Sequence, residues 1–197
     1  MKTGILIPCM DTVHTQFHIS LLRLIRDPDT VISHAVSSLV YDSRNALAEA
    51  AVKQGYDRVL WLDSDMVFDP DLMQRLSARL DEGYEMVSGL YTTRKNPIMP
   101  CIFSDIEPGK PAPFMREYPD DAIFEVAACG FGAVMMNVSL IREVGEVYGR
   151  PFSPVVGLGE DLSFCARVND LGKKIWCDSG IKLKHIGTHE YTVEDIE

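Results

Sequence analysis

The chain has 197 residues, the size of one typical domain, so one hydrophobic core and one functional site are expected. Hydrophobic residues make up 46% of the sequence and charged residues 24%, which excludes a disordered or collagen-like chain. The formal net charge of −10 would repel a polyanion, so nucleic acid is excluded as an expected partner.

Predicted strands and helices alternate over the first ninety residues. The helix starts are marked by two residue types favoured at N-caps, Ser43 and Asp69, and Gly55 follows the end of the first of these helices. In chain order we expect a strand at 5–7 closed by Pro8, a helix at 15–26, a helix at 43–54, a strand at 58–62, a helix at 69–80 and a strand at 85–91. This alternation predicts an α/β fold with a mostly parallel central sheet covered by helices, in which ligands bind beyond the carboxyl ends of the strands.

The second half of the sequence begins with a proline-rich segment. Residues 96–121 contain six prolines and no sustained period, which predicts a long surface segment with at most one short strand at 101–103. After it we expect strands at 124–128 and 132–136, a helix from Ser139 to Gly145, a helix at 160–171, a strand at 174–177 and a tail that carries His185. No internal repeat is present, so the prediction is one domain spanning 1–197.

The pattern Asp-x-Asp occurs at 27–29, 63–65 and 69–71, so the bare pattern decides nothing. The first copy follows a helix and the third opens one, and these structural roles explain both. By contrast, Asp63 and Asp65 follow an apolar strand, so both carboxylates can point into the crevice where α/β sheets bind ligands. Oxygen ligands at this spacing suit Mg²⁺ or Mn²⁺, and in so acidic a chain a cation is needed to hold a diphosphate. A solvated acidic turn is the alternative.

A second candidate is the helix start at Glu160 and Asp161, which follows the glycine-flanked loop 157–159. One explanation is structural, because acidic side chains stabilise the first turn of a helix. The functional explanation is that the helix end holds Asp161 ionised and rigidly placed, as a general base requires when it takes a proton from an attacking hydroxyl. The two explanations are compatible.

Arg44 is expected between a strand end and a helix, where its planar guanidinium suits a phosphate or a nucleobase; an exposed helix-start arginine is the alternative. Two histidine pairs have i, i+4 spacing, His14 with His18 and His185 with His189, but neither lies in a helical pattern typical of zinc. His185, at a strand end, is a candidate to complete a metal site of mixed oxygen and nitrogen ligands, and a histidine with an ordinary hydrogen bond is the alternative.

These motifs, taken in order, resemble those of the GT-A glycosyltransferases, particularly family-2-like bacterial and phage-encoded members. They are Ile5-Leu6-Ile7-Pro8, Ser43-Arg44-Asn45, Val59-Leu60-Trp61-Leu62-Asp63-Ser64-Asp65-Met66, Gly130-Phe131-Gly132, Gly159-Glu160-Asp161-Leu162-Ser163-Phe164-Cys165 and His185-Ile186-Gly187. The resemblance covers the whole chain. It implies a Rossmann-like sheet with a small antiparallel portion in the C-terminal half, built from a nucleotide-binding half, 1–95, and an acceptor and catalytic half, 96–197.

The resemblance also implies metal-dependent transfer of a sugar from a UDP- or GDP-linked donor to a hydroxyl of an unknown sugar, lipid or protein acceptor, with inversion expected more than retention. Mn²⁺ or Mg²⁺ would be the cofactor. The implied roles are nucleotide contacts by Pro8, Arg44, Asp63 and Ser64, metal ligation by Asp65 and His185, contacts to donor or acceptor sugar by Gly130, Phe131 and Glu160, and general-base catalysis by Asp161.

Two other functions remain open at this point. The run 62–67 also fits an aspartate-nucleophile phosphatase, in which Asp63 would attack phosphorus and Asp65 would serve as acid and base, although such enzymes usually carry the motif on their first strand. A nucleotide-sugar-binding domain without turnover is the non-enzymatic alternative.

The five cysteines are widely spaced and form no C-x-x-C pair, and no run is long and apolar enough for a signal peptide or a membrane span. We therefore expect a reduced, cytoplasmic protein without a transmembrane segment. A homo-oligomer is possible.

Overall fold

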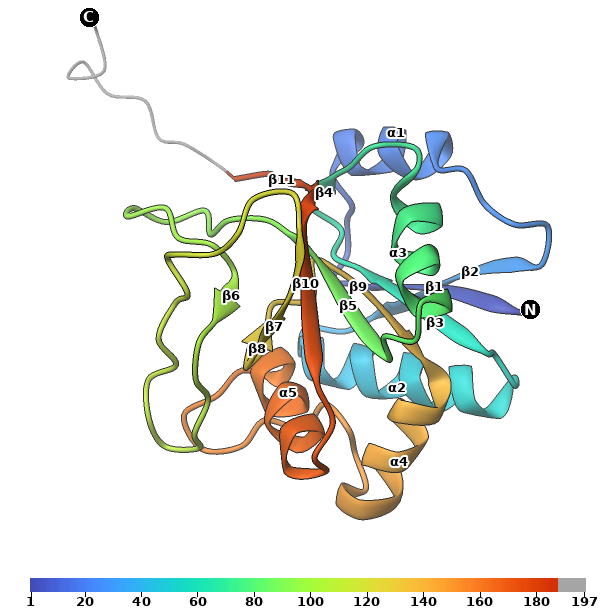
Figure 1. Ribbon diagram of the computed structural model, residues 1–197. Helices are drawn as coiled ribbons and strands as arrows, with labels where there is room; N and C mark the ends of the chain where they lie inside the picture. The colour runs from blue at the N-terminus through green and yellow to red at the C-terminus, as the bar shows by residue number, and fades with distance from the viewer. Residues whose placement is uncertain (188–197) are drawn as a thin grey trace, which may run out of the picture.

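A seven-stranded sheet forms the centre of the protein, with the order β2-β1-β3-β9-β5-β10-β7 (Figure 1). The computed structural model describes residues 1–187. The strands of this sheet are β1 (Thr3–Cys9), β2 (Thr30–Val36), β3 (Arg58–Leu62), β5 (Met86–Leu90), β7 (Ile123–Val126), β9 (Ala133–Asn137) and β10 (Ile175–Lys182). Strands β9 and β7 run antiparallel to their neighbours, and the other five share one direction. The predicted α/β class with a mostly parallel sheet and an antiparallel part in the second half is confirmed.

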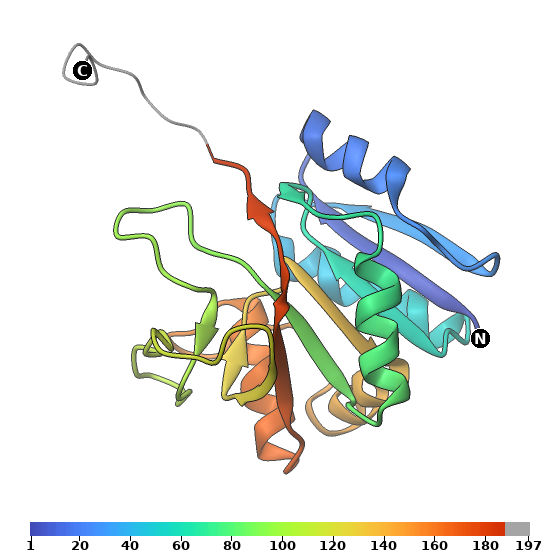
Figure 2. The ribbon, with the colours of Figure 1, turned by 45° about the horizontal axis from the view of Figure 1, so that its top comes forward.

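Helices cover both faces of this sheet (Figures 1 and 2). On one face lie α2 (Val40–Lys53), α4 (Val138–Tyr148) and α5 (Glu160–Asp170), and on the other lie α1 (Thr15–Arg23) and α3 (Leu72–Asp81). Every residue of β3 and of β5 is buried, as expected for strands that are covered on both sides. Two hydrophobic clusters, one on each face, therefore hold the helices to the sheet.

Two short antiparallel pairs extend the architecture around the carboxyl ends of the strands. β11 (Lys184–His185) pairs with β4 (Met66–Val67), and β6 (Ile102–Phe103) pairs with β8 (Ala128–Cys129). The first pair brings a segment near the end of the described chain onto the turn that follows β3. None of the helices within residues 1–187 is long and apolar enough to cross a membrane.

Several predicted boundaries are wrong for local reasons. Helix α2 begins at Val40 rather than at Ser43, because the Ser37 hydroxyl accepts a hydrogen bond from the Leu39 amide and the helical turn forms earlier. Helix α4 follows β9 without a linker, so Asn137 and not Ser139 is its N-cap residue. The helix ends at Tyr148 rather than at Gly145, and Gly149, whose φ is 78°, follows its end. Strand β1 continues through the predicted end to Cys9.

Other differences concern strands at the rim of the sheet. Strand β2 was not predicted; it is an edge strand with four half-buried residues, three exposed ones and no fully buried one, so it lacks a strong apolar pattern. Strand β10 continues five residues beyond the predicted end at Cys177. Helix α3 begins at Leu72, with Asp71 rather than Asp69 at the N-cap. Helix α1 ends at Arg23, three residues before the predicted end at residue 26.

Candidate active site

The turn Asp63-Ser64-Asp65 leaves the carboxyl end of β3 and is held by the backbone on both sides. The Asp63 amide donates to the Gly132 carbonyl at 3.2 Å, and the Ser64 carbonyl accepts from the His14 amide at 3.1 Å. Both carboxylates are partly buried, with exposed side-chain fractions of 29% for Asp63 and 17% for Asp65. The strand-end copy of Asp-x-Asp thus lies where the edge of the sheet meets the loops of the second half.

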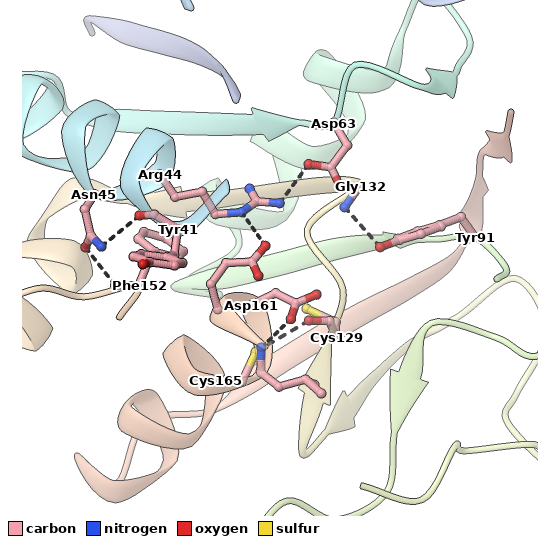
Figure 3. A network of polar contacts seen from close by, with 12 residues as sticks. Tyr41, Arg44, Asn45, Asp63, Tyr91, Cys129, Gly132, Phe152, Asp161 and Cys165 are labelled. Atoms are coloured by element: carbon pink, nitrogen blue, oxygen red, sulfur yellow. Dashed lines mark hydrogen bonds and ion pairs between the residues drawn. The ribbon is translucent and has the colours of Figure 1, made fainter. Parts of the chain in front are cut away.

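Arg44 links this turn to the start of α5 (Figure 3). Its Nη2 lies 2.7 Å from Asp63 Oδ1, and its Nε lies 3.2 Å from Glu160 Oε1. Burial by itself would lower the pKa of Arg44, but the neighbouring carboxylates, Asp63 first, outweigh this effect and raise it. The guanidinium is therefore a permanent positive charge between two acidic side chains that are far apart in sequence.

The position of Arg44 differs from the expected one. It lies inside α2, not ahead of a helix, and its side chain is only 2% exposed. Its guanidinium carbon lies 5.1 Å from the ring centroid of Phe131 and 5.7 Å from that of Trp61. Contact between Arg44 and a nucleotide stays a prediction. The geometry shows that the buried guanidinium holds the carboxylates of Asp63 and Glu160 in place.

Asp161 occupies the first turn of α5, beside Glu160. The Leu162 amide donates to its Oδ1 at 2.7 Å, which fixes the orientation of the carboxylate. Burial and then repulsion by Glu160 raise the pKa of Asp161 to about 6, against an opposing attraction from Arg44. A carboxylate with this pKa is ionised at neutral pH and is a stronger base than an exposed aspartate.

His185 reaches the site because β11 pairs with β4. The Ile186 amide donates to the Asp65 carbonyl at 2.8 Å, and His185 Nε2 lies 3.4 Å from Asp65 Oδ2. His185 Nδ1 lies 2.8 Å from the carbonyl oxygen of Thr92. Burial opposes the charged forms of both side chains, but their mutual interaction lowers the pKa of Asp65 and raises the pKa of His185.

These contacts also test whether the pair suits a divalent metal. A carbonyl oxygen can only accept, so His185 Nδ1 carries the proton and Nε2 faces Asp65, the arrangement typical of a metal-binding histidine. Asp65 Oδ1 is buried and has no hydrogen-bond partner among the described residues. No group of three or more His, Cys, Asp or Glu side chains within 1–187 is arranged to hold a metal, so an ion here would complete its shell with water and substrate oxygens, as Mg²⁺ and Mn²⁺ commonly do. His189, the other member of the predicted histidine pair, lies outside the described residues.

The segment Gly130-Phe131-Gly132 joins β8 to β9 beneath the site. Phe131 is fully buried and packs edge-on against Phe152 and Phe164. Its side chain thus supports Arg44 from within the core, and a sugar contact by this segment stays a prediction for its backbone. Pro8 is also buried, near the carboxyl end of β1 and paired with Ala35 of β2.

Sequence reasoning missed the segment that follows β5. Arg94 Nη1 lies 2.7 Å from Asp65 Oδ2, and the Tyr91 hydroxyl accepts from the Gly132 amide at 3.2 Å. The rule that ligand-binding residues follow strand ends also applies to this loop, and it would have drawn attention to Arg94.

Comparisons with known proteins establish the fold. No protein-family model matches the chain, and no curated protein matches its sequence. Among solved structures, A197 from STIV has a TM-score of 0.69 at 24% identity, with 95% of this chain and 87% of that one covered. GalNAc-T7 with UDP, GalNAc and Mn²⁺ has a TM-score of 0.68 at 11% identity; the match covers 96% of this chain and 44% of that one, so the chain spans less than half of its length. The chain has the GT-A fold, as the motif resemblance implied.

Proposed function

We propose that this protein is a metal-dependent glycosyltransferase that moves a sugar from a UDP- or GDP-linked donor to an acceptor hydroxyl. The fold supports this proposal, as does the structure of GalNAc-T7, which was solved with UDP, GalNAc and Mn²⁺. A fold alone hosts many chemistries, so the proposal depends on the site.

One observation carries the proposal: four segments that are distant in sequence meet at the carboxyl ends of the strands. Arg44 of α2 joins Asp63, after β3, to Glu160 of α5, while His185 of β11 contacts Asp65. We infer from this convergence that Asp161 serves as the base and His185 as a nitrogen ligand beside the Asp63–Asp65 turn. Neither an isolated acidic turn nor a helix-start acid needs such partners.

In the proposed reaction, Asp161 accepts the proton of the acceptor hydroxyl. The acceptor oxygen forms a bond to the anomeric carbon as the bond from that carbon to the diphosphate oxygen breaks, and the nucleoside diphosphate leaves with the bonding electron pair. The raised pKa of Asp161, about 6, suits this role at neutral pH. Arg44 holds the neighbouring Glu160 carboxylate in place through the contact between its Nε and Glu160 Oε1.

Asp65 and His185 would hold the Mn²⁺ or Mg²⁺ ion. The ion would supply positive charge for the leaving diphosphate, which the acidic site cannot provide by itself. Asp63 contacts Arg44 and is assigned a contact with the nucleotide ribose. Ser64 and Pro8 are assigned further contacts with the nucleotide. Gly130, Phe131 and Glu160 would border the sugars.

The proposal is tested by thermal shift with UDP and GDP, each with and without Mn²⁺. A nucleotide present at about 100 times its Kd stabilises the protein by about 2.7 kcal/mol, and we expect this stabilisation only with Mn²⁺. Asp65→Asn should remove the metal-dependent shift. Asp69→Asn is the matched control, because it makes the same change in the Asp-x-Asp copy that precedes α3, and it should leave the shift intact.

Three outcomes would contradict the proposal. A wild-type protein without any metal-dependent shift would lack the donor site. Release of phosphate from monoesters, without sugar transfer, would favour the phosphatase. Binding of nucleotide and Mn²⁺ without transfer across a broad panel of donors and acceptors would leave a nucleotide-sugar-binding domain.

A further inference from the structure

Arg94 forms an ion pair with Asp65, the carboxylate to which the proposed function assigns the metal. Its Nη1 lies 2.7 Å from Asp65 Oδ2, closer than the 3.4 Å that separates this oxygen from His185 Nε2. The same Nη1 lies 3.2 Å from the carbonyl oxygen of Ile186. Arg94 therefore bridges the turn after β3 and the segment after β11.

The attachment of Arg94 differs from that of Arg44. The Arg44 side chain is 2% exposed and contacts two carboxylates, whereas the Arg94 side chain is 46% exposed and contacts one. Arg94 lies in a turn closed by the backbone bridge between Thr92 and Pro100. The guanidinium can leave Asp65 by side-chain rotation while the turn keeps its backbone contacts.

Electrostatics makes Arg94 and a divalent ion compete for Asp65. Two cations repel each other at the short distances that both would have from Asp65 Oδ2, so binding of a metal to this carboxylate weakens its contact with Arg94. A guanidinium released at this edge would face the diphosphate oxygens, for which its planar set of donors is suited. The site also carries the acidic side chains of Asp63, Glu160 and Asp161, so a donor with two phosphates needs such a cation.

We propose that Arg94 has two alternative partners. It pairs with Asp65 when no metal is bound, and it pairs with the donor diphosphate once a metal holds Asp65. This inference rests on the proposed function, since it assumes the metal at Asp65 and the diphosphate of the donor.

The proposal makes opposite predictions for two ligands of one variant. Arg94→Gln removes the competing charge, so Mn²⁺ titrated without nucleotide, followed by its electron paramagnetic resonance signal, should bind several-fold more tightly. With Mn²⁺ saturating, calorimetric titration with UDP and GDP should show affinity about tenfold weaker than in the wild type, because one charged hydrogen bond to the diphosphate is lost.

Lys95→Gln is the control, since it removes the same charge from the adjacent exposed residue of the same turn. It should change both affinities less than about twofold, because a charge that only contributes to the general field is screened by salt. Melting temperatures of the two variants, each without ligands, check that both are folded.

The outcomes separate the inference from the function it rests on. The inference is supported if Arg94→Gln binds Mn²⁺ more tightly and nucleotide more weakly than the wild type while Lys95→Gln does neither. If the wild type binds both ligands and Arg94→Gln behaves as Lys95→Gln does, the inference fails and the proposed function stands. A wild type that binds neither ligand overturns both.

Discussion

Among single residues, Arg44 and Asp161 show how burial is used in the site. Truncating one partner of a buried ion pair typically costs about 3–5 kcal/mol, whereas an exposed pair contributes about 0–1 kcal/mol. Arg44 is 2% exposed and Arg150, which pairs with Asp42 near the start of the same helix, is 59% exposed. The arginine that joins α2 to the site is therefore the structural one, and it creates the charged surroundings in which Asp161 operates.

Asp161→Asn should abolish transfer and stabilise the protein at neutral pH. Loss of a general base typically lowers the rate by about 10²- to 10⁴-fold. The folded-state pKa of about 6 lies above the ordinary value of 3.8, so the protonated form of Asp161 is favoured by folding. The stabilisation that comes from protonated Asp161 is fully present below pH 3.8 and is lost as the pH rises through about 6. The neutral asparagine avoids this loss.

Two measurements check this prediction. Chemical unfolding should show the variant to be more stable than the wild type by roughly 1–3 kcal/mol at pH 7.5, with the difference shrinking toward pH 4. In the wild type, kcat/KM should increase as the pH rises through about 6, the pKa of Asp161. Unchanged transfer in the variant would return Asp161 to the role of a helix-start acid, and lower stability at pH 7.5 would contradict the assigned pKa direction.

Among the elements, β5 and the segment between β8 and β9 are fitted to each other through Tyr91. This buried tyrosine lies directly after β5, and its ring packs edge-on against His185 with centroids 5.4 Å apart. The Tyr91 hydroxyl accepts a hydrogen bond from the Gly132 amide, and the Gly132 carbonyl accepts one from the Asp63 amide. The aromatic ring thus connects the proposed metal ligand to the turn that carries both aspartates, and glycine is needed where the ring lies against the backbone.

Substitutions at the two glycines should respond differently to Tyr91→Phe. A Cβ at Gly130 would clash with the Tyr91 hydroxyl, whereas a Cβ at Gly132 would lie 2.8 Å from two ring carbons of the same residue. Each alanine variant should lose roughly 1–3 kcal/mol of stability through overpacking. Because phenylalanine lacks only the hydroxyl, it should restore much of the loss in Gly130→Ala and little in Gly132→Ala.

This comparison is a pair of double-mutant cycles measured by chemical unfolding. A coupling energy of about 1 kcal/mol or more is expected for Tyr91 with Gly130. Equal coupling at both glycines would mean that the backbone moves away from the ring, and the proposed fit between these elements would be wrong.

At the scale of the whole molecule, the two expected halves are interleaved in one sheet. Strand β9 lies between β3 and β5, and β10 lies beside β5, although both belong to the second half of the chain. The hydrophobic cluster on the face covered by α2, α4 and α5 likewise combines residues from both halves of the chain. The site lies along the seam between the halves, so neither half contains all of it.

A fragment of residues 1–95 should therefore not fold alone. Without β9, strands β3 and β5 lose the partner that joins them, and the face of α2 that packs on α4 becomes exposed. We expect the fragment to lack a cooperative thermal transition by circular dichroism, while the full chain shows one. A cooperative transition in the fragment would identify 1–95 as an independent nucleotide-binding domain.

Local sequence patterns were sufficient for the central strands and for selecting one acidic turn. The apolar run 59–62 leads to the correct prediction of β3 at 58–62, because an uninterrupted apolar run is typical of a strand covered on both faces. Its end singles out Asp63 and Asp65 among three Asp-x-Asp copies, since ligands of α/β sheets bind there. The family resemblance placed Asp161 and His185 in the same site.

The side chains that surround these residues depend on long-range packing. Arg44 lies 19 residues from Asp63 and 116 from Glu160, and a pairing over such separations has no local periodicity to reveal it. Arg94 meets Asp65 only because β5 and β3 are held on either side of β9, and β9 comes from the second half of the chain. The fold class and the acidic turn are predictable from the sequence, because both depend on short runs of hydrophobic and turn residues. The order of the strands determined which cations face that turn, because this order depends on long-range packing.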